Sequence, residues 1–417
     1  MINANEYSIS IVIRIFLFLS RLWSNGPKEL LEFTNHSFEQ HFGRPIPSYP
    51  PRAVIYEYLT GRAKAGDIRK YIRFETAVRH VDFNKETNQF DVTVEDLTKQ
   101  THENLTFDYL IVATGHYSVP NMPYFDGVSR FPGRVLHSHE YRGADEFLNQ
   151  NILIVGGGYS AEDIAMQCHK FGVKSVTASY RSCPMGYKWP SNVREVPLLE
   201  RIENRRAHFK DGTFVDDLDS IIMCTGYRHH HPYMAEHLRL RMNVNAFIPP
   251  NLYKGLFWVT QPRLVYLGMQ NQTYTFTMFD AQTALVRDVL LGLVELPAAN
   301  DEAARRAEIA RWQALETVIP PGDHEGASDL QTAYIKDTLS FCVPATAPIF
   351  DFDRATKGVY KFFDDKRQNI ATYRDQPYDS IFPPYKKAPI TNVPWMKAMD
   401  DTVEGFMSTI QDSTTSS

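Results

Sequence analysis

Hydrophobic positions are grouped most clearly between Asn151 and Arg181. An apolar run, Ile152–Val155, leads directly into a glycine-rich turn, and a stretch with helical spacing of apolar residues, Ile164–Cys168, follows it. A second apolar run, Ser175–Tyr180, completes the segment. This order of strand, tight turn, helix and strand predicts a βαβ unit, which holds a dinucleotide pyrophosphate at a helix N-terminus.

The turn has the spacing Gly-x-Gly-x-x-Ala. Gly156 permits the sharp turn, Gly158 lets the backbone approach a phosphate, and Ala161 allows the helix to pack closely against the strand. We predict that the dinucleotide is bound by Gly156, Gly158, Ser160 and Ala161. The alternative is a glycine-rich turn that binds no ligand.

The end of the second strand indicates which dinucleotide is bound. An NAD site has Asp or Glu there, which accepts a hydrogen bond from the ribose 2′-hydroxyl. This strand ends in Tyr180-Arg181-Ser182 instead, and the planar cation of Arg181 suits a 2′-phosphate. We therefore predict NADP(H); the alternative is that Arg181 is only a solvated residue at a strand end.

Two further apolar strands bracket this unit. Tyr109–Val112 runs into Ala113-Thr114-Gly115, and Ser220–Cys224 runs into Thr225-Gly226-Tyr227. Alternating residues between 71 and 95 predict a β-meander ahead of them. The pattern predicts an α/β fold with two nested Rossmann-like domains, in which the two bracketing strands are the crossings between domains.

The predicted division of the chain follows from these strands. An atypical segment occupies residues 1–21, the outer domain 22–118 and 221–400, the inserted NADP domain 119–220, and a polar tail 401–417.

Composition and charge exclude several classes of protein. With 417 residues and a net charge of −5, the chain has no polybasic feature that favours nucleic acid or an anionic membrane. The apolar stretch Ile9–Leu19 is too short to span a bilayer. Four widely spaced cysteines without a CxxC pair indicate a cytoplasmic protein and argue against a disulfide reductase. Three consecutive histidines, His229–His231, rarely converge on one ion, so no metal site is predicted.

A longer motif precedes the glycine turn. It has the spacing Phe-x-Gly-x-x-x-His-x-x-x-Tyr and consists of Phe131, Gly133, His137 and Tyr141. With the stretches LWSNGPKE, SYPPR, PMGYKWP, CTGY, NLYKG and MFDAQ, it resembles class B flavin-containing monooxygenases over nearly the whole chain. Baeyer–Villiger relatives usually close this motif with Trp, so Tyr141 favours the branch that oxygenates heteroatoms. Within it, the chain is most similar to members that act on trimethylamine.

The resemblance implies an enzyme with two cofactors. In this family NADPH reduces FAD, O2 adds at flavin C4a, and the hydroperoxyflavin gives one oxygen atom to an amine or a sulfide. The outer domain would then bind FAD, and the substrates would be O2 and a small amine or sulfide. The resemblance also suggests a homodimer.

The same resemblance assigns roles to individual residues. Asn25 would hydrogen-bond beside the flavin without titrating, and Tyr159 would face flavin and substrate. The alternatives are a turn-forming asparagine and a surface tyrosine. His137 and Tyr141 would couple the domains by packing. Further predicted cofactor contacts are Val78, Thr114, Gly115 and Gln270.

Two features depart from the family. Its members carry a glycine loop for the FAD pyrophosphate ahead of the LWSNGPK motif, but only about twenty residues precede that motif here, too few for a βαβ unit. We therefore expect an N-terminally truncated copy, with an inactive NADP-binding pseudoenzyme as the alternative. In the predicted substrate pocket, Thr273 replaces a usual aromatic residue next to Tyr274. This weakens a cation–π cage and leaves larger amines or sulfides open as substrates.

Overall fold

The apolar run Ile152–Val155 lies in the middle of a parallel sheet. The computed structural model describes residues 22–242 and 246–410, and the sheet has the order β6-β13-β7-β8-β9 with every neighbouring pair parallel. Its strands are β6 (Arg134–His137), β7 (Asn151–Val155), β8 (Ser175–Ser179), β9 (Val193–Val196) and β13 (Ser220–Met223). The central strands β7 and β13 are buried along nearly their full length, as a sheet covered on both faces requires.

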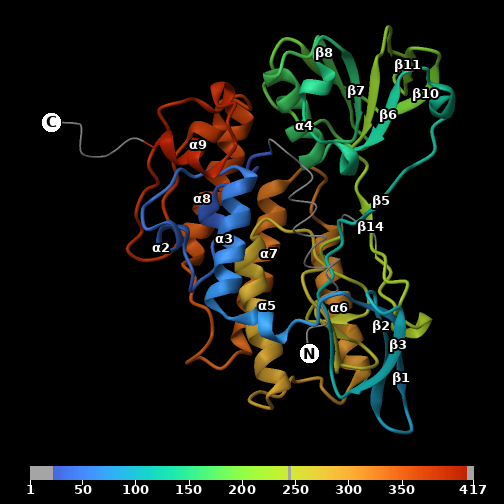
Figure 1. The fold of residues 1–417 in the computed structure, drawn as a ribbon, viewed down its shortest axis with the longest axis vertical. Helices are drawn as coiled ribbons and strands as arrows, with labels where there is room; N and C mark the ends of the chain where they lie inside the picture. Colours follow the sequence, from blue (N-terminus) through green and yellow to red (C-terminus); the bar gives the residue numbers. More distant parts are fainter. Residues whose placement is uncertain (1–21, 243–245, 411–417) are drawn as a thin grey trace.

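Alternate residues of β7 pack against different layers. Ile152 and Ile154 contact helix α4 (Tyr159–Lys170), whereas Leu153 and Val155 contact a small antiparallel sheet. That sheet consists of β10 (Leu199–Glu203), β11 (Arg206–Phe209) and β12 (Phe214–Val215). The predicted βαβ unit β7-α4-β8 is thus confirmed. We call residues 125–224 the sheet lobe, which lies at the upper right of Figure 1.

Residues 22–118, 225–242 and 246–410 form what we call the base lobe, and residues 119–124 connect it to the sheet lobe. The predicted meander is present, with β1 (Thr76–Asn84), β2 (Gln89–Asp96) and β3 (Thr101–Phe107) antiparallel in sequence order. A second sheet has the order β15-β16-β17-β4. In this sheet β17 and β4 pair parallel, whereas β15 with β16 and β16 with β17 pair antiparallel. Its strands are β4 (Leu110–Val112), β15 (Leu252–Tyr253), β16 (Phe257–Trp258) and β17 (Leu264–Tyr266).

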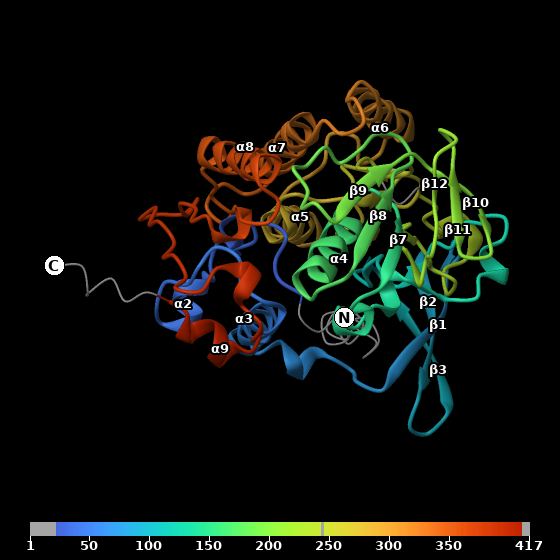
Figure 2. The same cartoon turned by 90° about the horizontal axis from the view of Figure 1, so that it is seen from above.

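Helices make up the other half of the base lobe. They are α2 (Phe38–Phe42), α3 (Arg52–Ala65), α5 (Thr275–Leu290), α6 (Glu302–Thr317), α7 (His324–Ser340), α8 (Phe352–Gln368) and α9 (Val403–Ser408). Short 3-10 helices occur in both lobes. In the base lobe they are η1 (Lys28–Leu30), η2 (Ile68–Tyr71), η6 (Glu236–Leu238), η7 (Tyr373–Asp375) and η8 (Trp395–Lys397), and in the sheet lobe η3 (Val128–Arg130), η4 (Ser138–Glu140) and η5 (Asp145–Phe147). Met166 of α4 joins the core of this helical layer, so α4 lies between the parallel sheet and the helices, as Figure 2 shows.

The crossings between the lobes differ from the prediction. β13 is an internal strand of the sheet lobe, and β4 is an edge strand of the base lobe. The chain crosses instead at β5 (Val119–Pro120) and β14 (Tyr227–Arg228), which pair antiparallel because one leaves the base lobe and the other returns (Figure 1). The Thr-Gly motifs therefore precede the crossings rather than lying within them.

Some predicted segments fall outside the described residues. These are 1–21, predicted as atypical, and 411–417 of the predicted polar tail. The rest of that tail is packed, because α9 buries Phe406 against Trp23. The division at residue 220 stays a prediction, although the pairing of β13 supports a boundary after Met223. In the part of the chain that the structure describes, no helix has the length and apolarity needed to cross a membrane.

Candidate active site

The glycine turn joins β7 to α4 at the carboxyl end of the sheet. Gly156 has a φ of +139°, and a Cβ there would lie 2.2 Å from the Cys224 carbonyl oxygen, so the position requires glycine. A Cβ on Gly158 would meet no atom within 4 Å. The amides of Tyr159 and Ser160 lie in the first turn of α4 and have no intrahelical acceptor. The turn therefore fits a pyrophosphate, because it offers N–H donors, a positive helix end and open space.

Arg181 lies at the same edge of the sheet, two residues beyond β8, and is exposed. The Cβ of the preceding residue, Tyr180, lies 3.4 Å from the position of a Cβ on Gly157. Arg181 is thus adjacent in the chain to a residue that contacts the glycine turn. Its interaction with a 2′-phosphate stays a prediction.

Tyr159 of the sheet lobe meets Thr273 of the base lobe. The tyrosine is half-buried, and the Thr273 side chain interacts with its hydroxyl. Burial raises the pKa of Tyr159, so the phenol is protonated at physiological pH. Thr273 is itself held by Gln331 of α7: its N–H donates to Gln331 Oε1 at 2.7 Å, and its Oγ1 accepts from Gln331 Nε2 at 3.3 Å. Two residues predicted for the site are therefore brought together from different lobes.

Asn25 lies half-buried in the turn before η1. Its neighbour Ser24 is fixed on both sides: the Ser24 N–H donates to the Pro50 carbonyl at 2.9 Å, and its carbonyl accepts from Arg374 Nε at 3.1 Å. The Asn25 side chain hydrogen-bonds none of the residues that the structure describes. An amide held on a fixed turn can both donate and accept a hydrogen bond, which suits contact with a ligand.

Gln270 and Tyr274 lie deeper than expected for ligand contacts. Gln270 is fully buried; its Nε2 donates to the Gly255 carbonyl and the Tyr334 hydroxyl, each at 3.2 Å, and its Oε1 accepts from Gln282 at 3.0 Å. Tyr274 is 2% exposed and belongs to the helical core. The side-chain amide of Gln270 is therefore engaged within the protein, and both residues support the loop that carries Thr273.

The other predicted cofactor contacts lie in the base lobe near its strands. Val78 is half-buried on β1 opposite Val94. Thr114 and Gly115 follow β4, where Gly115 has a φ of +69° and the Thr114 hydroxyl lies 3.5 Å from the Tyr233 hydroxyl. Their contact with a cofactor stays a prediction.

The fingerprint residues lie in and beside the sheet lobe and are packed. A Cβ on Gly133 would lie 2.6 Å from the Phe131 ring, so glycine allows the ring to cover the backbone. His137 is buried; its Nδ1 accepts a hydrogen bond from the His139 N–H at 3.0 Å, and its ring centroid lies 5.2 Å from that of Tyr227 in the returning strand β14. Tyr141 is 1% exposed. These positions agree with roles in packing and in the connection between the lobes.

Three neutral histidines lie where the chain crosses between lobes. His116 precedes β5, and His229 and His231 follow β14. Burial lowers the pKa of His116 to about 3 and those of His229 and His231 to about 4. His116 and His229 stack with ring centroids 4.8 Å apart. Among the described residues, no group of three or more His, Cys, Asp or Glu side chains is arranged to hold a metal ion.

Four charged residues that the sequence pattern did not single out meet beside Tyr159. They are Glu162 and Asp163 of α4, Lys366 of α8 and Arg374 of η7. Glu162 and Lys366 are 204 positions apart in the chain. No periodicity or spacing pairs residues so distant, so this cluster had no local signal.

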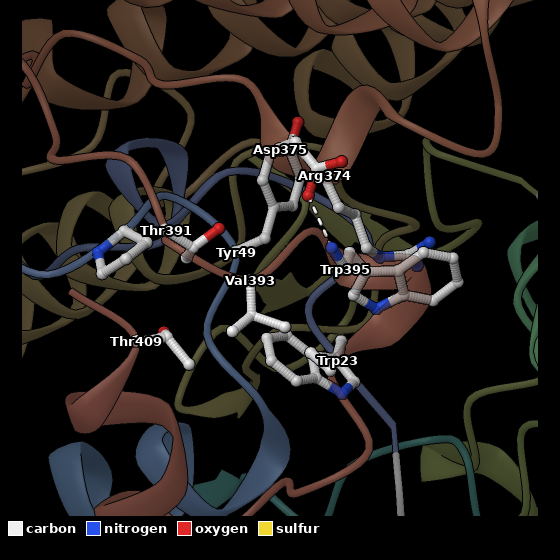
Figure 3. Close-up of a pocket in the computed structure, with 10 residues that line it drawn as sticks. Trp23, Tyr49, Arg374, Asp375, Thr391, Val393, Trp395 and Thr409 are labelled. Atoms are coloured by element: carbon white, nitrogen blue, oxygen red, sulfur yellow. Dashed lines mark hydrogen bonds between the residues drawn. The ribbon is translucent and has the colours of Figure 1, made fainter. Parts of the chain in front are cut away.

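The structure also contains a small cavity and an open groove. One is a cavity of about 10 Å³ between Trp23, Tyr49, Arg374 and Trp395, where the backbone N–H of Trp395 donates to Asp375 Oδ1 at 2.6 Å (Figure 3). This volume holds about one water molecule. The other is an open groove of about 450 Å³, which includes Lys336, Phe350 and Tyr385. Neither is lined by Asn25, Tyr159 or Thr273, so we do not assign the reaction to them.

Comparison with known proteins relates this geometry to a family. A sequence model of flavin-binding monooxygenase-like proteins matches residues 14–185 and 191–350. A trimethylamine monooxygenase of Methylocella silvestris is 50% identical over 92% of this chain and 83% of its own length. A trimethylamine monooxygenase of Pelagibacter ubique is 44% identical over 93% of this chain and 84% of its own.

Solved structures agree with these sequence matches. The crystal structure of Tmm from a Pelagibacter strain matches with a TM-score of 0.87 at 41% identity, over 93% of this chain and 85% of that one. S-allyl-L-cysteine S-oxygenase from Allium sativum matches with a TM-score of 0.74 at 22% identity, over 87% and 81% of the two chains. The second likeness concerns the fold alone.

Proposed function

The chain belongs to the flavin-binding monooxygenase-like family, and we propose that it uses NADPH and O2 to oxygenate the nitrogen of a small tertiary amine such as trimethylamine. The observation that carries this proposal is the match to trimethylamine monooxygenases along nearly the whole chain. The reaction converts the amine, O2, NADPH and a proton into the amine N-oxide, water and NADP+. FAD is the cofactor that the family implies.

The residues at the start of α4 fit NADPH. Glycine at position 158 leaves space beside the backbone, and the amides of Tyr159 and Ser160 are available to phosphate oxygens. Arg181, at the same edge of the sheet, supplies a guanidinium for the 2′-phosphate. The sheet lobe would therefore hold the nucleotide, and the base lobe the flavin.

FAD, when bound, would carry the electrons of NADPH to O2 and activate the oxygen, while the protein orients the groups that react. Asn25 offers an amide that donates and accepts without changing its charge. Tyr159 offers a hydroxyl that stays protonated, because burial raises its pKa. Thr273 orients this hydroxyl and is held in turn by Gln331. Together these side chains would exclude water and direct hydrogen bonds toward the reacting groups.

A second candidate, a larger amine or sulfide substrate, is favoured by the small side chain at position 273. Thr273 is half-buried next to Tyr159, and a hydroxyl with one methyl group fills less space than an aromatic ring. A wider space beside Tyr159 would accept substituents longer than methyl.

The test is product formation by the purified protein supplied with FAD, NADPH and trimethylamine. We expect equal amounts of NADP+ and trimethylamine N-oxide, measured by absorbance at the nicotinamide band and by proton NMR. Dimethyl sulfide and a bulkier tertiary amine form the comparison set. Faster turnover of the bulky amine would favour the second candidate, and NADPH oxidation without any N- or S-oxide would contradict the proposed function.

A further inference from the structure

Two helices from different lobes share a buried ionic contact beside Tyr159. Lys366 of α8 is fully buried, and its ammonium donates to Glu162 Oε2 of α4 at 2.7 Å. Glu162 is 1% exposed and accepts further hydrogen bonds from the hydroxyls of Tyr187 at 3.1 Å and Tyr373 at 3.3 Å. The charge pair therefore joins the sheet lobe to the base lobe with its carboxylate satisfied from three directions.

The same ammonium faces the ring of Tyr159. Lys366 Nζ lies 5.0 Å from the Tyr159 ring centroid, 4.8 Å from that of Phe362, and 5.4 Å from those of Tyr187 and Tyr373. A cation near aromatic rings is attracted to them most strongly when water is excluded. Lys366 thus contacts both the helix that carries Tyr159 and the ring itself.

A second ionic contact lies beside the first and reaches Asn25. Arg374 of η7 is 6% exposed, and its Nη2 pairs with the carboxylate of Asp163, the residue after Glu162. Its Nε donates to the carbonyl of Ser24 at 3.1 Å. A rigid guanidinium fork suits such a double connection. One side chain therefore links α4 to the turn that carries Asn25.

Stability alone is a weak reason for these contacts. Removing charges from water costs free energy, and replacing a buried ion pair by apolar residues of similar volume is often neutral or stabilising. A hydrogen-bonded ion pair, however, fixes the relative position of its two groups, whereas an apolar contact allows two surfaces to slide against each other. Two pairs on successive residues of α4 thus restrict both the position and the rotation of this helix against the base lobe.

We propose that Lys366 and Arg374 are positioning residues, which hold helix α4 on the base lobe and thereby fix Tyr159 relative to Asn25. This inference rests on the proposed function, in which α4 binds NADPH and these two side chains border the reacting groups. Loss of the contacts would let α4 move, admit water beside Tyr159 and divert NADPH electrons from the N-oxide to H2O2.

The test uses a double variant and a matched control. E162Q/K366M removes both charges of one pair at once, so that neither is left buried alone. The control, E325Q/R367M, removes the neighbouring pair, in which Arg367 Nη2 lies 2.6 Å from Glu325 Oε1. That pair also joins α8 to another helix, α7, but it is partly exposed and lies within the base lobe.

Three quantities are measured for the FAD-loaded proteins: amide hydrogen exchange of α4 beyond its first turn (Asp163–Lys170) without nucleotide, the Kd for NADP+, and the H2O2 released per NADPH. For E162Q/K366M we expect each to rise by about fivefold or more, the lower end of coupling between linked sites. For E325Q/R367M each should stay near the wild-type value.

Two results would overturn the inference. One is wild-type hydrogen exchange in α4 of E162Q/K366M. The other is a lower Tm for this variant with an unchanged H2O2 yield and an unchanged Kd, since that pattern belongs to a purely structural pair. A wild-type protein that binds no NADP+ would instead contradict the proposed function, and the exchange of the unliganded helix would still decide the positioning role.

Discussion

The two lobes are built from the chain in different ways. The sheet lobe uses one continuous segment, and its dinucleotide turn depends on residues that lie near one another in sequence or on the adjacent strand, such as Gly156 and Cys224. The base lobe is assembled from both ends of the described chain, and its helical core includes Trp23 and Ile410. The geometry of the glycine turn in the first is therefore set locally, whereas side chains of the second are placed by tertiary packing.

This difference locates the candidate site at the contact between the lobes. Tyr159 is placed by the local βαβ geometry, but its hydroxyl partner Thr273 and its cationic neighbour Lys366 come from the base lobe. Substitutions in the glycine turn should therefore act on the sheet lobe alone, and substitutions at the contact should act on both.

The largest effect is expected where the sheet lobe is most constrained. Gly156→Ala would place a Cβ 2.2 Å from the Cys224 carbonyl at a φ of +139°, which costs about 3 kcal/mol of unfolding free energy through strain and overpacking. Chemical denaturation should report this loss, and NADP+ binding should disappear.

Gly158→Ala is its matched control, because a Cβ there meets no atom within 4 Å. This variant should keep wild-type stability and weaken only NADP+ binding. Equal destabilisation by the two substitutions would contradict the assigned role of Gly156.

The buried histidines at the crossing between the lobes should make the free energy of unfolding depend on pH. Burial lowers the pKa of His231 to about 4 from an ordinary value of 6.5; His229, His230 and Arg239 lower it further. Between these values the unfolded chain binds a proton that the folded chain does not, so the free energy of unfolding falls as pH falls from 6.5 toward 4. The slope per histidine is about 1.4 kcal/mol per pH unit.

His231→Phe keeps a ring in contact with Tyr266, whose centroid lies 5.2 Å away, and removes the titration. The free energy of unfolding of this variant, taken from denaturation curves at several pH values, should change less steeply between pH 4 and 6.5. The difference in slope from the wild type should be about that value. An unchanged pH dependence would show that His231 is protonated in the folded protein.

Substitution of Arg181 tests nucleotide recognition by the sheet lobe without changing the base lobe. Arg181→Ala should weaken NADP+ binding about tenfold, the value of one charged hydrogen bond, because its guanidinium would no longer meet the 2′-phosphate. NAD+ serves as the internal control in the same titration calorimetry. A parallel loss of affinity for both nucleotides would contradict the assignment.

The smallest effect tests the contact between lobes directly. Tyr159→Phe and Thr273→Val each remove one partner of the hydroxyl contact. In a double-mutant cycle, the change in unfolding free energy of the double variant should differ from the sum of the two single changes by about 1 kcal/mol. Strict additivity would mean that the two side chains do not interact in solution.

Much of the sheet lobe was predictable because its signals are local. The strand, glycine turn and helix from Ile152 to Cys168 appear in the structure as predicted, since apolar periodicity and turn chemistry act over a few residues. The meander was predictable for the same reason.

The contacts at the site were less predictable. Nothing in the sequence pairs Glu162 with Lys366, because only tertiary packing brings α8 against α4. The prediction that the Thr-Gly strands themselves cross between lobes was wrong, because a strand that ends in Thr-Gly can sit inside a sheet, as β13 does. Gln270 resembled a ligand contact by its position after β17, but its side chain is bonded to Gln282 and Tyr334.

The central claim is that the site forms where the two lobes meet. Amide hydrogen exchange of the FAD-loaded protein, with and without NADP+, tests it most directly, because it reports both lobes in one experiment. We predict slower exchange on binding NADP+ in two segments, the turn and first helical turn at 157–162 and the loop at 271–274. Protection confined to 157–162 would contradict it, because the nucleotide would then contact the sheet lobe alone.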